Sequence, residues 1–541
     1  MIPPDARSQV HAPYAGDTLL PLLSARAMAE ADTRTIETFG IAGRTLMESA
    51  GRAAVDIMEK RYGQLRGQHV FCCCGRGNNG GDGLVMARVL LARGARVTVV
   101  LPFPEEKLSP DCAVNLALLQ KIAGSAGQQL KIRTDVAGLE SAHQADYVVD
   151  ALLGTGLTSA PREPIATLVR WINEQSATCV AIDIPTGLDS DTGVALDPTV
   201  RADLTVTMAA LKSGLVLGDG LVHAGDIHLA EIGIPSHLIE DAMKDHPEGC
   251  AWLPHDAAIA RMLPTRAADA HKYEAGYVLV VGGSEGMAGA PLLSARAAAR
   301  SGAGYVTMAV PESIREAVHG GFVEATTVAL PLTPSESAAG SHSGTELEAR
   351  IQRADAMVLG PGLGRTDTAQ QLVVDLLSSV DLPVVIDADA LFALVEHPEL
   401  LHEYGRPSWV LTPHAGEFSR LAGEGTGDGN PIELARTYAS QWNCTLVLKG
   451  RPSVVASPDK RVAVDANGSS ALATAGSGDV LAGLIGGLLA QNLSPFNAAL
   501  CGLEIGGATA RFLTKRRSAT SLIASDLLEA LPDVLHSRYG Q

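Results

Sequence analysis

The chain has 541 residues, a formal net charge of −18 and 46% hydrophobic residues. Because a single domain holds roughly 100–250 residues, this length indicates two or three domains. The acidic charge and the lack of a dense Lys/Arg run argue against a nucleic-acid partner. No apolar run is long enough for a membrane span and no basic, apolar leader occurs, so we expect no membrane association and a cytoplasmic protein.

Eight cysteines are present, and three of them, Cys72–Cys74, follow one another in an apolar run typical of a strand. Neighbouring strand residues point to opposite faces, so these three thiols cannot bind one metal ion together. The sequence also has no CxxC pair. We therefore expect buried free thiols, which suit a reducing compartment.

Short β-rich runs alternate with Ala/Leu-rich stretches along the whole chain, a pattern typical of parallel sheets with helices on both faces. The strands expected in the first half are 69–74, 97–101, 147–150, 180–184 and 204–208. Those expected in the second half include 277–281, 357–359, 384–387, 409–411 and 446–448. A polar segment between the halves predicts domains at 1–235 and 252–541 with a linker at 236–251, and a Ser/Ala/Gly-rich stretch predicts a surface loop at 334–345.

The most distinctive motif of the first half is the Gly-rich turn Gly75–Gly83, which follows a strand and precedes an amphipathic stretch at 84–93. Glycines let the backbone approach a ligand closely, and a helix N-terminus offers free N–H groups to an anion. The alternative is a plain tight turn. The position of the motif at a strand end, which faces the ligand crevice of an open α/β sheet, favours binding.

Two further strands of the first half end in a carboxylate. Asp150 precedes a Gly/Thr-rich loop, and Asp183 precedes a Pro-Thr-Gly turn. A carboxylate buried at a strand end is costly unless it is paired, hydrogen-bonded or used in function. Asn79, Asp150 and the Thr186 hydroxyl could together coordinate a hard cation through oxygen. The alternative is that Asp150 and Asp183 cap the turns that follow them.

The motifs Asn78–Asp82, Asp150–Gly156, Asp183–Asp189 and Ala202–Thr207 occur in this order, and together they resemble the NAD(P)H-hydrate epimerase domain over roughly residues 20–235. The resemblance implies interconversion of the R and S hydrates at C6 of the nicotinamide ring. It implies that Asn79, Asp150 and Thr186 bind a potassium ion, although the family commonly has Ser at the last position. The implied substrate-binding residues are Asn78, Asn79, Gly80, Gly81, Asp82, Gly154, Thr155, Gly156, Leu157, Thr158, Ser159, Ala160 and Asp183.

Epimerisation at C6 needs a group that transfers protons, and a carboxylate is suited to this step. We expect Asp183 to be the catalytic carboxylate of the first domain. The alternative is that Asp183 only anchors the substrate.

The most informative stretch of the chain is Thr474–Gly483, in which small residues precede Asp479 and an apolar helix. The N–H groups of residues 476–478 could form an anion hole at the start of this helix. Such a hole would face the charge that develops on a phosphoryl group during transfer. Asp479 could then take the proton from the attacking hydroxyl. An Asp at a helix start is otherwise an ordinary cap.

Four further loops follow strands of the second half, at residues 282–291, 360–364, 412–417 and 448–453. Parallel strands end at one edge of a sheet, so these loops should converge with Asp479 on a single site. His414 lies in the third loop, where a structural and a ligand-binding role both stay open.

This set resembles the ADP/ATP-dependent NAD(P)H-hydrate dehydratases, which are ribokinase-like, over roughly residues 252–535. The implied reaction phosphorylates the C6 hydroxyl and eliminates phosphate, with Mg²⁺ screening the phosphates. The implied contacts to the hydrate are Ala290, Gly362, His414 and Asp479, and those to the adenine nucleotide are Lys449, Gly450, Arg451, Pro452, Ser453 and Gly478. Ser453 replaces a more usual Thr, and the His expected near Glu504, on a continuation of the helix after Asp479, is missing.

Both resemblances concern one metabolite, so the sequence predicts a bifunctional repair enzyme with two three-layer αβα domains, the first Rossmann-like and the second ribokinase-like. The first would epimerise the hydrates of NADH and NADPH (NADHX and NADPHX). The second would dehydrate the S form with ADP, or ATP, as phosphoryl donor. The expected cofactors are K⁺ and Mg²⁺, and a homo-oligomer is expected because ribokinase-like dehydratases often assemble. The alternatives are a small-molecule kinase and a non-catalytic nucleotide-binding protein.

Overall fold

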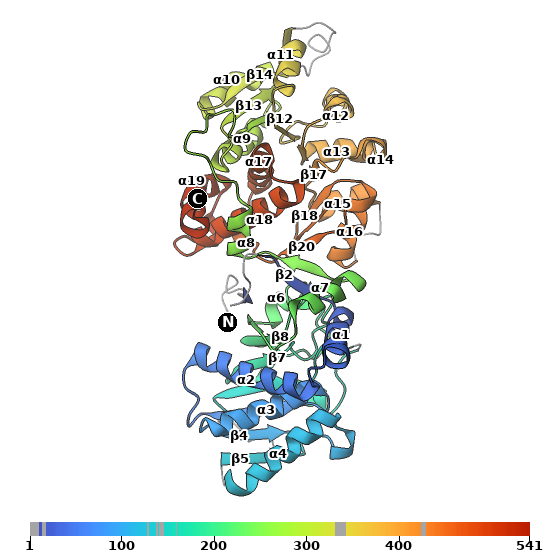
Figure 1. The fold of residues 1–541 in the computed structure, drawn as a ribbon. Coiled ribbons are helices and arrows are strands. Elements are labelled where there is room, and N and C mark those ends of the chain that lie inside the picture. The colour runs from blue at the N-terminus through green and yellow to red at the C-terminus, as the bar shows by residue number, and fades with distance from the viewer. Residues whose placement is uncertain are drawn as a thin grey trace. The chain divides into compact units, whose positions relative to one another are not determined.

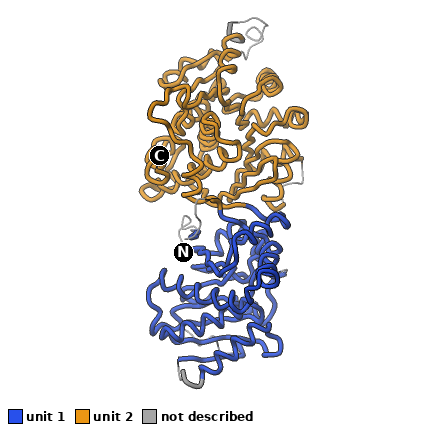
Figure 2. The backbone as a smooth tube through the Cα atoms, viewed as in Figure 1, with its two compact units in different colours: residues 1–15, 20–251 blue, residues 16–19, 252–541 orange. Residues whose placement is uncertain are grey.

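The computed structural model describes residues 10–12, 18–126, 129–136, 139, 145–157, 159–330, 342–423 and 429–540. The chain forms two compact units (Figure 2): unit 1 comprises residues 1–15 and 20–251, and unit 2 comprises residues 16–19 and 252–541. Among the described helices, none combines the length and the apolar composition needed to cross a bilayer.

Unit 1 is built on an eight-stranded sheet in which every pair of neighbouring strands is parallel (Figure 1). Its order is β1 (Val10–His11), β10 (Asp226–Ala230), β8 (Leu204–Met208), β7 (Thr178–Ile182), β6 (Tyr147–Ala151), β3 (His69–Cys74), β4 (Arg96–Val100) and β5 (Leu130–Arg133). Two short strands, β2 (Leu20–Leu23) and β9 (Leu211–Lys212), pair in parallel with each other. The helices are α1 (Ala25–Thr33), α2 (Gly43–Tyr62), α3 (Asn78–Ala92), α4 (Pro110–Ala126), α5 (Ile165–Glu174), α6 (Gly220–His223) and α7 (Ser236–Asp245).

The alternation of side chains along β3 shows that this sheet is covered on both faces. Val70, Cys72 and Cys74 pack into a core shared with α2, α3 and α4, whereas Phe71 and Cys73 pack into a second core shared with α5. Unit 1 is therefore a three-layer αβα unit. The eight cysteines are all buried and free, as the sequence predicts.

Residues 236–251, predicted as a linker, lie within unit 1 and contain α7. Ile239, Ala242 and Met243 are buried at helical spacing, and α7 packs against α1. This weak apolar periodicity is easily missed in a polar segment. The boundary between the units consequently falls at Ala251, at the end of the predicted linker, and the functional bounds of the two domains stay a prediction.

Unit 2 contains a sheet of mainly parallel strands (Figure 1). In order these are β14 (Thr326–Ala329), β13 (Tyr305–Val310), β12 (Tyr277–Val281), β15 (Ala356–Leu359), β16 (Val384–Ile386), β17 (Trp409–Leu411), β18 (Thr445–Leu448), β19 (Ser453–Ala456), β20 (Val462–Asp465) and β11 (Ala251–Leu253). Only β19 runs antiparallel to its neighbours among these described strands.

The helices of unit 2 cover both faces of this sheet. They are α8 (Asp256–Met262), α9 (Gly289–Arg300), α10 (Glu312–Gly321), α11 (His342–Ile351), α12 (Asp367–Ser379), α13 (Asp389–Glu396), α14 (Glu399–Tyr404), α15 (Ala415–Ala422), α16 (Pro431–Gln441), α17 (Ser477–Ala490), α18 (Pro495–Thr514) and α19 (Ala524–Tyr539). Val278 and Val280 of β12 share a core with α9, α17, α18 and α19. Leu279, between them on the strand, is also fully buried, and α12 to α16 lie on the other side of the sheet (Figure 1).

The predicted strands are all present, with ends that either match or shift by one or two residues. The predicted continuation of the helix after Asp479 is wrong, because α17 ends at Ala490 and α18 starts anew at Pro495, where Ser494 caps it. Of the predicted surface loop, residues 334–341 lie outside the described residues, and residues 342–345 begin α11.

Candidate active sites

The Gly-rich motif of unit 1 joins β3 to α3 at the carboxyl edge of the sheet. The helix already begins at Asn78, so Asn79 to Asp82 form its first turn rather than a loop. A Cβ on Gly80 would lie 1.9 Å from the carbonyl oxygen of Gly75, so only glycine allows this close approach. The motif thus brings the start of a helix, with its unpaired N–H groups, to the edge where the neighbouring parallel strands end.

Asp150, Thr186 and Asn79 form an oxygen-rich cluster at this edge. The buried Asp150 carboxylate accepts hydrogen bonds from the Thr186 hydroxyl (2.8 Å) and the Thr186 N–H (2.7 Å). Burial raises the pKa of Asp150 to about 6, although the hydrogen bonds from Thr186 lower it. The Asn79 amide donates to the carbonyl oxygen of Leu153 (2.9 Å), and its own side-chain oxygen is buried without a hydrogen-bond partner. These oxygens are the donor type that a hard cation takes.

Asp183 follows β7 directly and has a left-handed backbone, with a φ of 68°. Its N–H donates to the carbonyl oxygen of Val206 (2.7 Å), which holds this unusual conformation in place. Its Oδ1 pairs with the ammonium of Lys212. Its Oδ2 faces the predicted substrate loop, because a Cβ on Gly154 would lie 3.5 Å from that oxygen and 3.7 Å from the Cβ of Asn79. The structure therefore brings Asp183, Gly154 and Asn79 together.

The other predicted substrate residues lie on the same two segments. The Asn78 side chain accepts from the Ser109 hydroxyl (3.1 Å), and the carbonyl oxygen of Thr155 accepts from Ser190 (3.3 Å). The remaining described members of the second segment are Gly156, Leu157, Ser159 and Ala160, and Thr158 lies outside the described residues.

Two charged residues near Asp183 were not found by sequence reasoning. One is Asp32, which lies on α1. Burial and the negative charge of Asp183 raise the pKa of Asp32 to about 6, whereas the positive charge of Lys212 lowers it. Asp82, which was predicted, has its pKa raised well above the ordinary value by burial and by the charges of Asp183 and Asp32. Lys212 lies on β9 and is 1% exposed. The signal that could have revealed it is a single Lys after the uncharged run 204–211.

In unit 2, Lys449 and Asp387 form a buried ion pair at the carboxyl edge of the sheet. The Lys449 ammonium lies 2.9 Å from Asp387 Oδ1, which also accepts from the Thr412 hydroxyl (2.8 Å). A Cβ on Gly478 would lie 3.7 Å from the Lys449 Nζ and 3.8 Å from Asp387 Oδ2. The pair therefore lies directly beside the first turn of α17, which carries Asp479. Sequence reasoning placed Asp387 at a strand end but gave it no role.

The start of α17 forms the predicted anion hole only in part. Gly476 caps the helix with a φ of 89°, a conformation that favours glycine, and the N–H of Val480 is bonded to the Gly476 carbonyl oxygen (3.0 Å). The Ser477 N–H is turned toward Thr474 (3.4 Å), so it already has an acceptor in the chain. The helix start still favours an anion at this position through its dipole.

The Asp479 carboxyl is the most strongly perturbed group of this site. Its pKa is raised to about 7 by burial and by the charges of Asp387 and Asp389, whereas the charge of Lys449 lowers it. Asp389 accepts from the N–H of Gly364 (2.9 Å), which ties it to a neighbouring glycine loop. A carboxyl with this pKa exchanges a proton readily near neutral pH.

The remaining predicted residues surround the same edge. A Cβ on Gly362 would lie 3.1 Å from Ala290, and the Gly362 carbonyl oxygen accepts from Ser284 (2.9 Å). His414 is exposed, its Nδ1 accepts from the N–H groups of Gly416 and Glu417, and it pairs as an isolated bridge with Lys449. In the segment Lys449, Gly450, Arg451, Pro452 and Ser453, the Gly450 N–H donates to the Ser453 hydroxyl oxygen (3.3 Å).

Comparison with known proteins agrees with this geometry. The family described as YjeF-related protein N-terminus matches residues 43–214, and the family described as NAD(P)H-hydrate dehydratase matches residues 278–533. The chain is 46% identical to the bifunctional NAD(P)H-hydrate repair enzyme of Salinibacter ruber over 96% of this chain and 97% of that protein. It is 34% identical to the enzyme of the same name from Escherichia coli, over 92% and 91% of the two chains.

The chain belongs to the bifunctional NAD(P)H-hydrate repair enzymes. Both predicted resemblances and the predicted fold class are thereby confirmed. Among solved structures, a Bacillus subtilis ADP/ATP-dependent NAD(P)H-hydrate dehydratase co-crystallised with ATP and Mg²⁺ is 31% identical, with a TM-score of 0.45 over 53% of this chain and 98% of that chain. A yeast protein covers 41% of this chain and 93% of its own, with 23% identity and a TM-score of 0.35.

The family resemblance implies a His near Glu504, and the structure has a buried polar cluster around Glu504 instead. Glu504 is fully buried, accepts from Asn467 (2.5 Å), and has a pKa raised to about 8 by burial and the charge of Asp465. Its second carboxyl oxygen and one nitrogen of Arg511 are buried without a hydrogen-bond partner. Since Asp465 pairs with Ser453 across β19 and β20, this cluster borders the predicted nucleotide segment.

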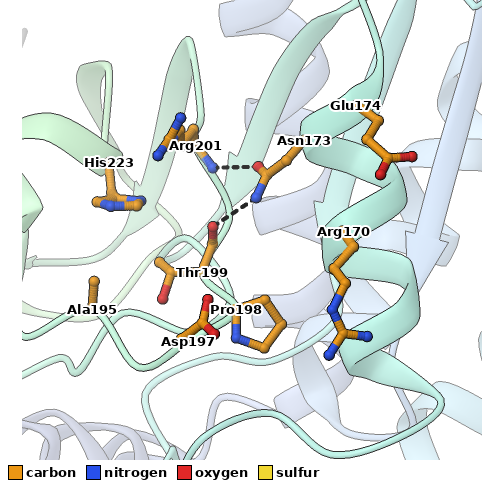
Figure 3. A pocket seen from close by; sticks show the side chains of 9 residues that line it. All are labelled: Arg170, Asn173, Glu174, Ala195, Asp197, Pro198, Thr199, Arg201 and His223. Carbon is orange, nitrogen blue, oxygen red and sulfur yellow. Dashed lines mark hydrogen bonds between the residues drawn. The ribbon is translucent and has the colours of Figure 1, made fainter.

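Unit 1 also has a surface pocket of about 490 Å³ (Figure 3). It is lined by Arg170, Asn173, Glu174, Ala195, Asp197, Pro198, Thr199, Arg201 and His223. Within the lining, the Asn173 side chain accepts a hydrogen bond from the Arg201 N–H (2.9 Å) and donates one to the Thr199 carbonyl oxygen (2.8 Å). Both acidic and basic side chains line the pocket, and none of the predicted site residues is among its lining residues.

Proposed function

We propose that unit 1 epimerises the R and S hydrates of NADH and NADPH, and that unit 2 dehydrates the S hydrate with ADP as phosphoryl donor, ATP being the alternative. The observation that carries this proposal is Asp479, a carboxyl with a pKa of about 7 at a helix start beside the Lys449–Asp387 pair. A general base works best when its pKa lies near the working pH. The helix start and the Lys449 ammonium would both attract the phosphoryl group.

In unit 2, Asp479 would take the proton of the C6 hydroxyl as that oxygen attacks the terminal phosphate of the nucleotide. The C6–O bond of the phosphorylated hydrate would then break, phosphate would leave, and C5 would lose a proton, which restores the C5–C6 double bond. Ala290, Gly362 and His414 are proposed to contact the hydrate. Mg²⁺, when bound, would neutralise phosphate charge.

The nucleotide is proposed to lie along Lys449, Gly450, Arg451, Pro452, Ser453 and Gly478. The proximity of Gly478 to the Lys449 Nζ supports a shared role of the two ends of this set, since a Cβ on Gly478 would lie 3.7 Å from that nitrogen. Gly478 without a side chain leaves room for a phosphate against the helix start.

In unit 1, Asp183 is proposed to move the proton of the C6 hydroxyl, with the hydrate held between the first turn of α3 and the segment 154–160. K⁺ is proposed to bind Asn79, Asp150 and Thr186. The partnerless side-chain oxygen of Asn79, which is buried next to these groups, supports that site. A K⁺ ion there would supply a fixed positive charge that a polar substrate group can approach.

A homo-oligomer and a cytoplasmic location are also proposed for the full chain. The presence of only free, buried thiols among the eight cysteines agrees with a reducing compartment.

The decisive experiment supplies a mixture of R and S NADH hydrate, or of the NADPH hydrates, with ADP or ATP, and follows the return of reduced-cofactor absorbance. We expect complete recovery with the parent chain and ADP. An Asp479→Asn variant should recover nothing, and an Asp183→Asn variant should stop once the S form is used.

A stable phosphorylated product from a hydroxylated vitamin or sugar would instead favour a small-molecule kinase. Nucleotide binding without turnover of either epimer would favour a non-catalytic protein.

A further inference from the structure

Lys212 is a deeply buried charged side chain near the unit 1 site. Its side chain is 1% exposed, and its ammonium has three described partners: Asp183 Oδ1, the Met208 carbonyl oxygen (2.9 Å) and the Thr207 hydroxyl (3.2 Å). An ammonium has three N–H donors. These partners therefore use the whole donor capacity of Lys212, which leaves none for a substrate.

The backbone is built to bring Lys212 back to the strand ends. After β8 the chain turns at Ala209, which has a φ of 62°, and the Ala210 N–H donates to the Met208 carbonyl oxygen (2.7 Å). Lys212 then enters β9, where it pairs in register with Leu23 of β2. A left-handed backbone is energetically unfavourable for a residue other than glycine. The presence of this turn therefore suggests that it serves to place Lys212 at the strand ends.

The contact with Lys212 determines how Asp183 presents its carboxylate. Oδ1 is held by the ammonium and lies 3.4 Å from the Met208 N–H. Oδ2 is left facing the glycine of the substrate segment, since a Cβ on Gly154 would lie 3.5 Å from it. One oxygen is thus used for positioning, and the other is available toward the proposed hydrate site.

The ammonium is also the single described positive charge that acts on three carboxyl groups around it. These groups come from three elements: Asp32 from α1, Asp82 from α3, and Asp183 at the end of β7. Burial and mutual repulsion raise the pKa of both Asp32 and Asp82, and Lys212 opposes both effects. Without this ammonium the three carboxyl groups would face one another with no opposite charge between them.

From this geometry we infer that Lys212 is a positioning residue for epimerisation: it fixes Asp183 Oδ1 so that Oδ2 exchanges the proton of the C6 hydroxyl of the hydrate. The inference rests on the proposed epimerase function of unit 1. In the balanced step, Oδ2 accepts the hydroxyl proton as the C6 carbonyl forms and the C6–N1 bond breaks, with its electron pair passing to N1. Rotation about C5–C6 turns the other face of the carbonyl to N1, the C6–N1 bond re-forms, and Oδ2 returns the proton to the oxygen, while Lys212 keeps its three protons.

The test measures conversion of purified R hydrate to the S form, by chromatography and without nucleotide, so that unit 2 is idle. General acid–base groups contribute about 10²–10⁴-fold, so we expect Asp183→Asn to lower kcat at least about 100-fold. Lys212→Met should lower kcat at least about tenfold with little change in KM, because Lys212 acts through Asp183 and not on the substrate. Lys244→Met, a change of an exposed Lys on α7 of the same unit, should behave as the parent chain.

A double variant separates positioning from a structural role. In the Asp183→Asn background, Lys212→Met should cause no further loss in kcat, whereas effects that multiply would overturn the inference.

A milder variant covers the case in which Lys212→Met does not fold. Thr207→Val removes one acceptor of the ammonium and keeps its charge, and we expect a severalfold lower kcat at unchanged KM. A parent-like kcat in Thr207→Val together with an unfolded Lys212→Met would overturn the inference. Failure of the parent chain to epimerise would overturn the proposed function itself, so the two failures are distinguishable.

Discussion

Replacing Asp479 by Asn should stabilise unit 2 while abolishing dehydration. Asp479 has a pKa of about 7 instead of the ordinary 3.8, which means that the folded protein disfavours its charged form by about 4 kcal/mol, at roughly 1.4 kcal/mol for each tenfold change in acidity. Asn has nearly the same shape and no charge to bury next to Asp387 and Asp389. The carboxylate that is proposed to act as base is therefore expected to reduce stability.

The sign of the effect follows from proton linkage. Below pH 3.8 the carboxyl is neutral in the folded and the unfolded chain, so Asp479 costs nothing. Between pH 3.8 and about 7 the unfolded chain loses this proton first, which favours unfolding, and above about pH 7 the full cost is present. The stability gained by Asp479→Asn should accordingly be near zero at pH 4 and reach about 2–4 kcal/mol at pH 8.

The assay is denaturant unfolding of the full chain at several pH values, followed by tryptophan fluorescence. Three of the four tryptophans, Trp252, Trp409 and Trp442, belong to unit 2, so the signal reports mainly on this unit. Asp381→Asn is the matched control, because Asp381 is 96% exposed and its pair with Arg406 lies at the surface. A loss of stability in Asp479→Asn at pH 8, or a gain that does not depend on pH, would refute the reasoning.

Three further changes test the rest of the molecule. Gly80→Ala should destabilise unit 1 by about 3 kcal/mol or more, because the new Cβ would lie 1.9 Å from a backbone oxygen. Gly77→Ala is the control and should be close to neutral, because no atom lies within 4 Å of its Cβ position, and thermal unfolding compares the two variants. Asp150→Asn should remove the dependence of epimerisation on K⁺, measured in KCl against choline chloride; a K⁺ effect as large as in the parent would contradict the site. Lys449→Met should cost about 3–5 kcal/mol and weaken ADP binding, measured by unfolding and calorimetry, because it leaves Asp387 buried and unpaired; parent-like values in both would contradict its role.

The sequence predicts the strand ends of both sites well, because a carboxylate or glycine after a buried β-rich run is a local signal. His69–Cys74 and Tyr277–Val281 have the predicted bounds, and the residues that follow them meet at the expected edges. The linker was harder to predict, because α7 is a short amphipathic helix whose apolar positions, Ile239, Ala242 and Met243, are diluted by charged residues. Whether this segment forms a helix depends on its packing against α1, which is more than two hundred residues away in the chain.

The ion pairs of the two sites could not be predicted for a related reason. Asp183 and Lys212 are 29 residues apart, and Asp387 and Lys449 are 62 residues apart. Spacing along the chain gives no sign that such residues meet, since the pairing depends on which parallel strands become neighbours. The sequence predicts Lys449 only as a nucleotide contact and gives Asp387 no role. The two residues meet because β16, β17 and β18 are neighbours in the sheet.

Both units reach the same electrostatic arrangement from different parts of the chain. In each, a parallel sheet collects carboxyl groups at one edge, and a single largely buried Lys from a nearby strand holds one of them by a close ion pair. Burial of several carboxyl groups raises the pKa of those that the Lys does not hold, as seen for Asp82 and Asp479. In unit 2 the edge therefore offers one anchored carboxylate, Asp387, and one carboxyl, Asp479, with a pKa of about 7. In unit 1 the anchored carboxylate, Asp183, is itself the proposed acid–base group, so the two edges use the same arrangement in different ways.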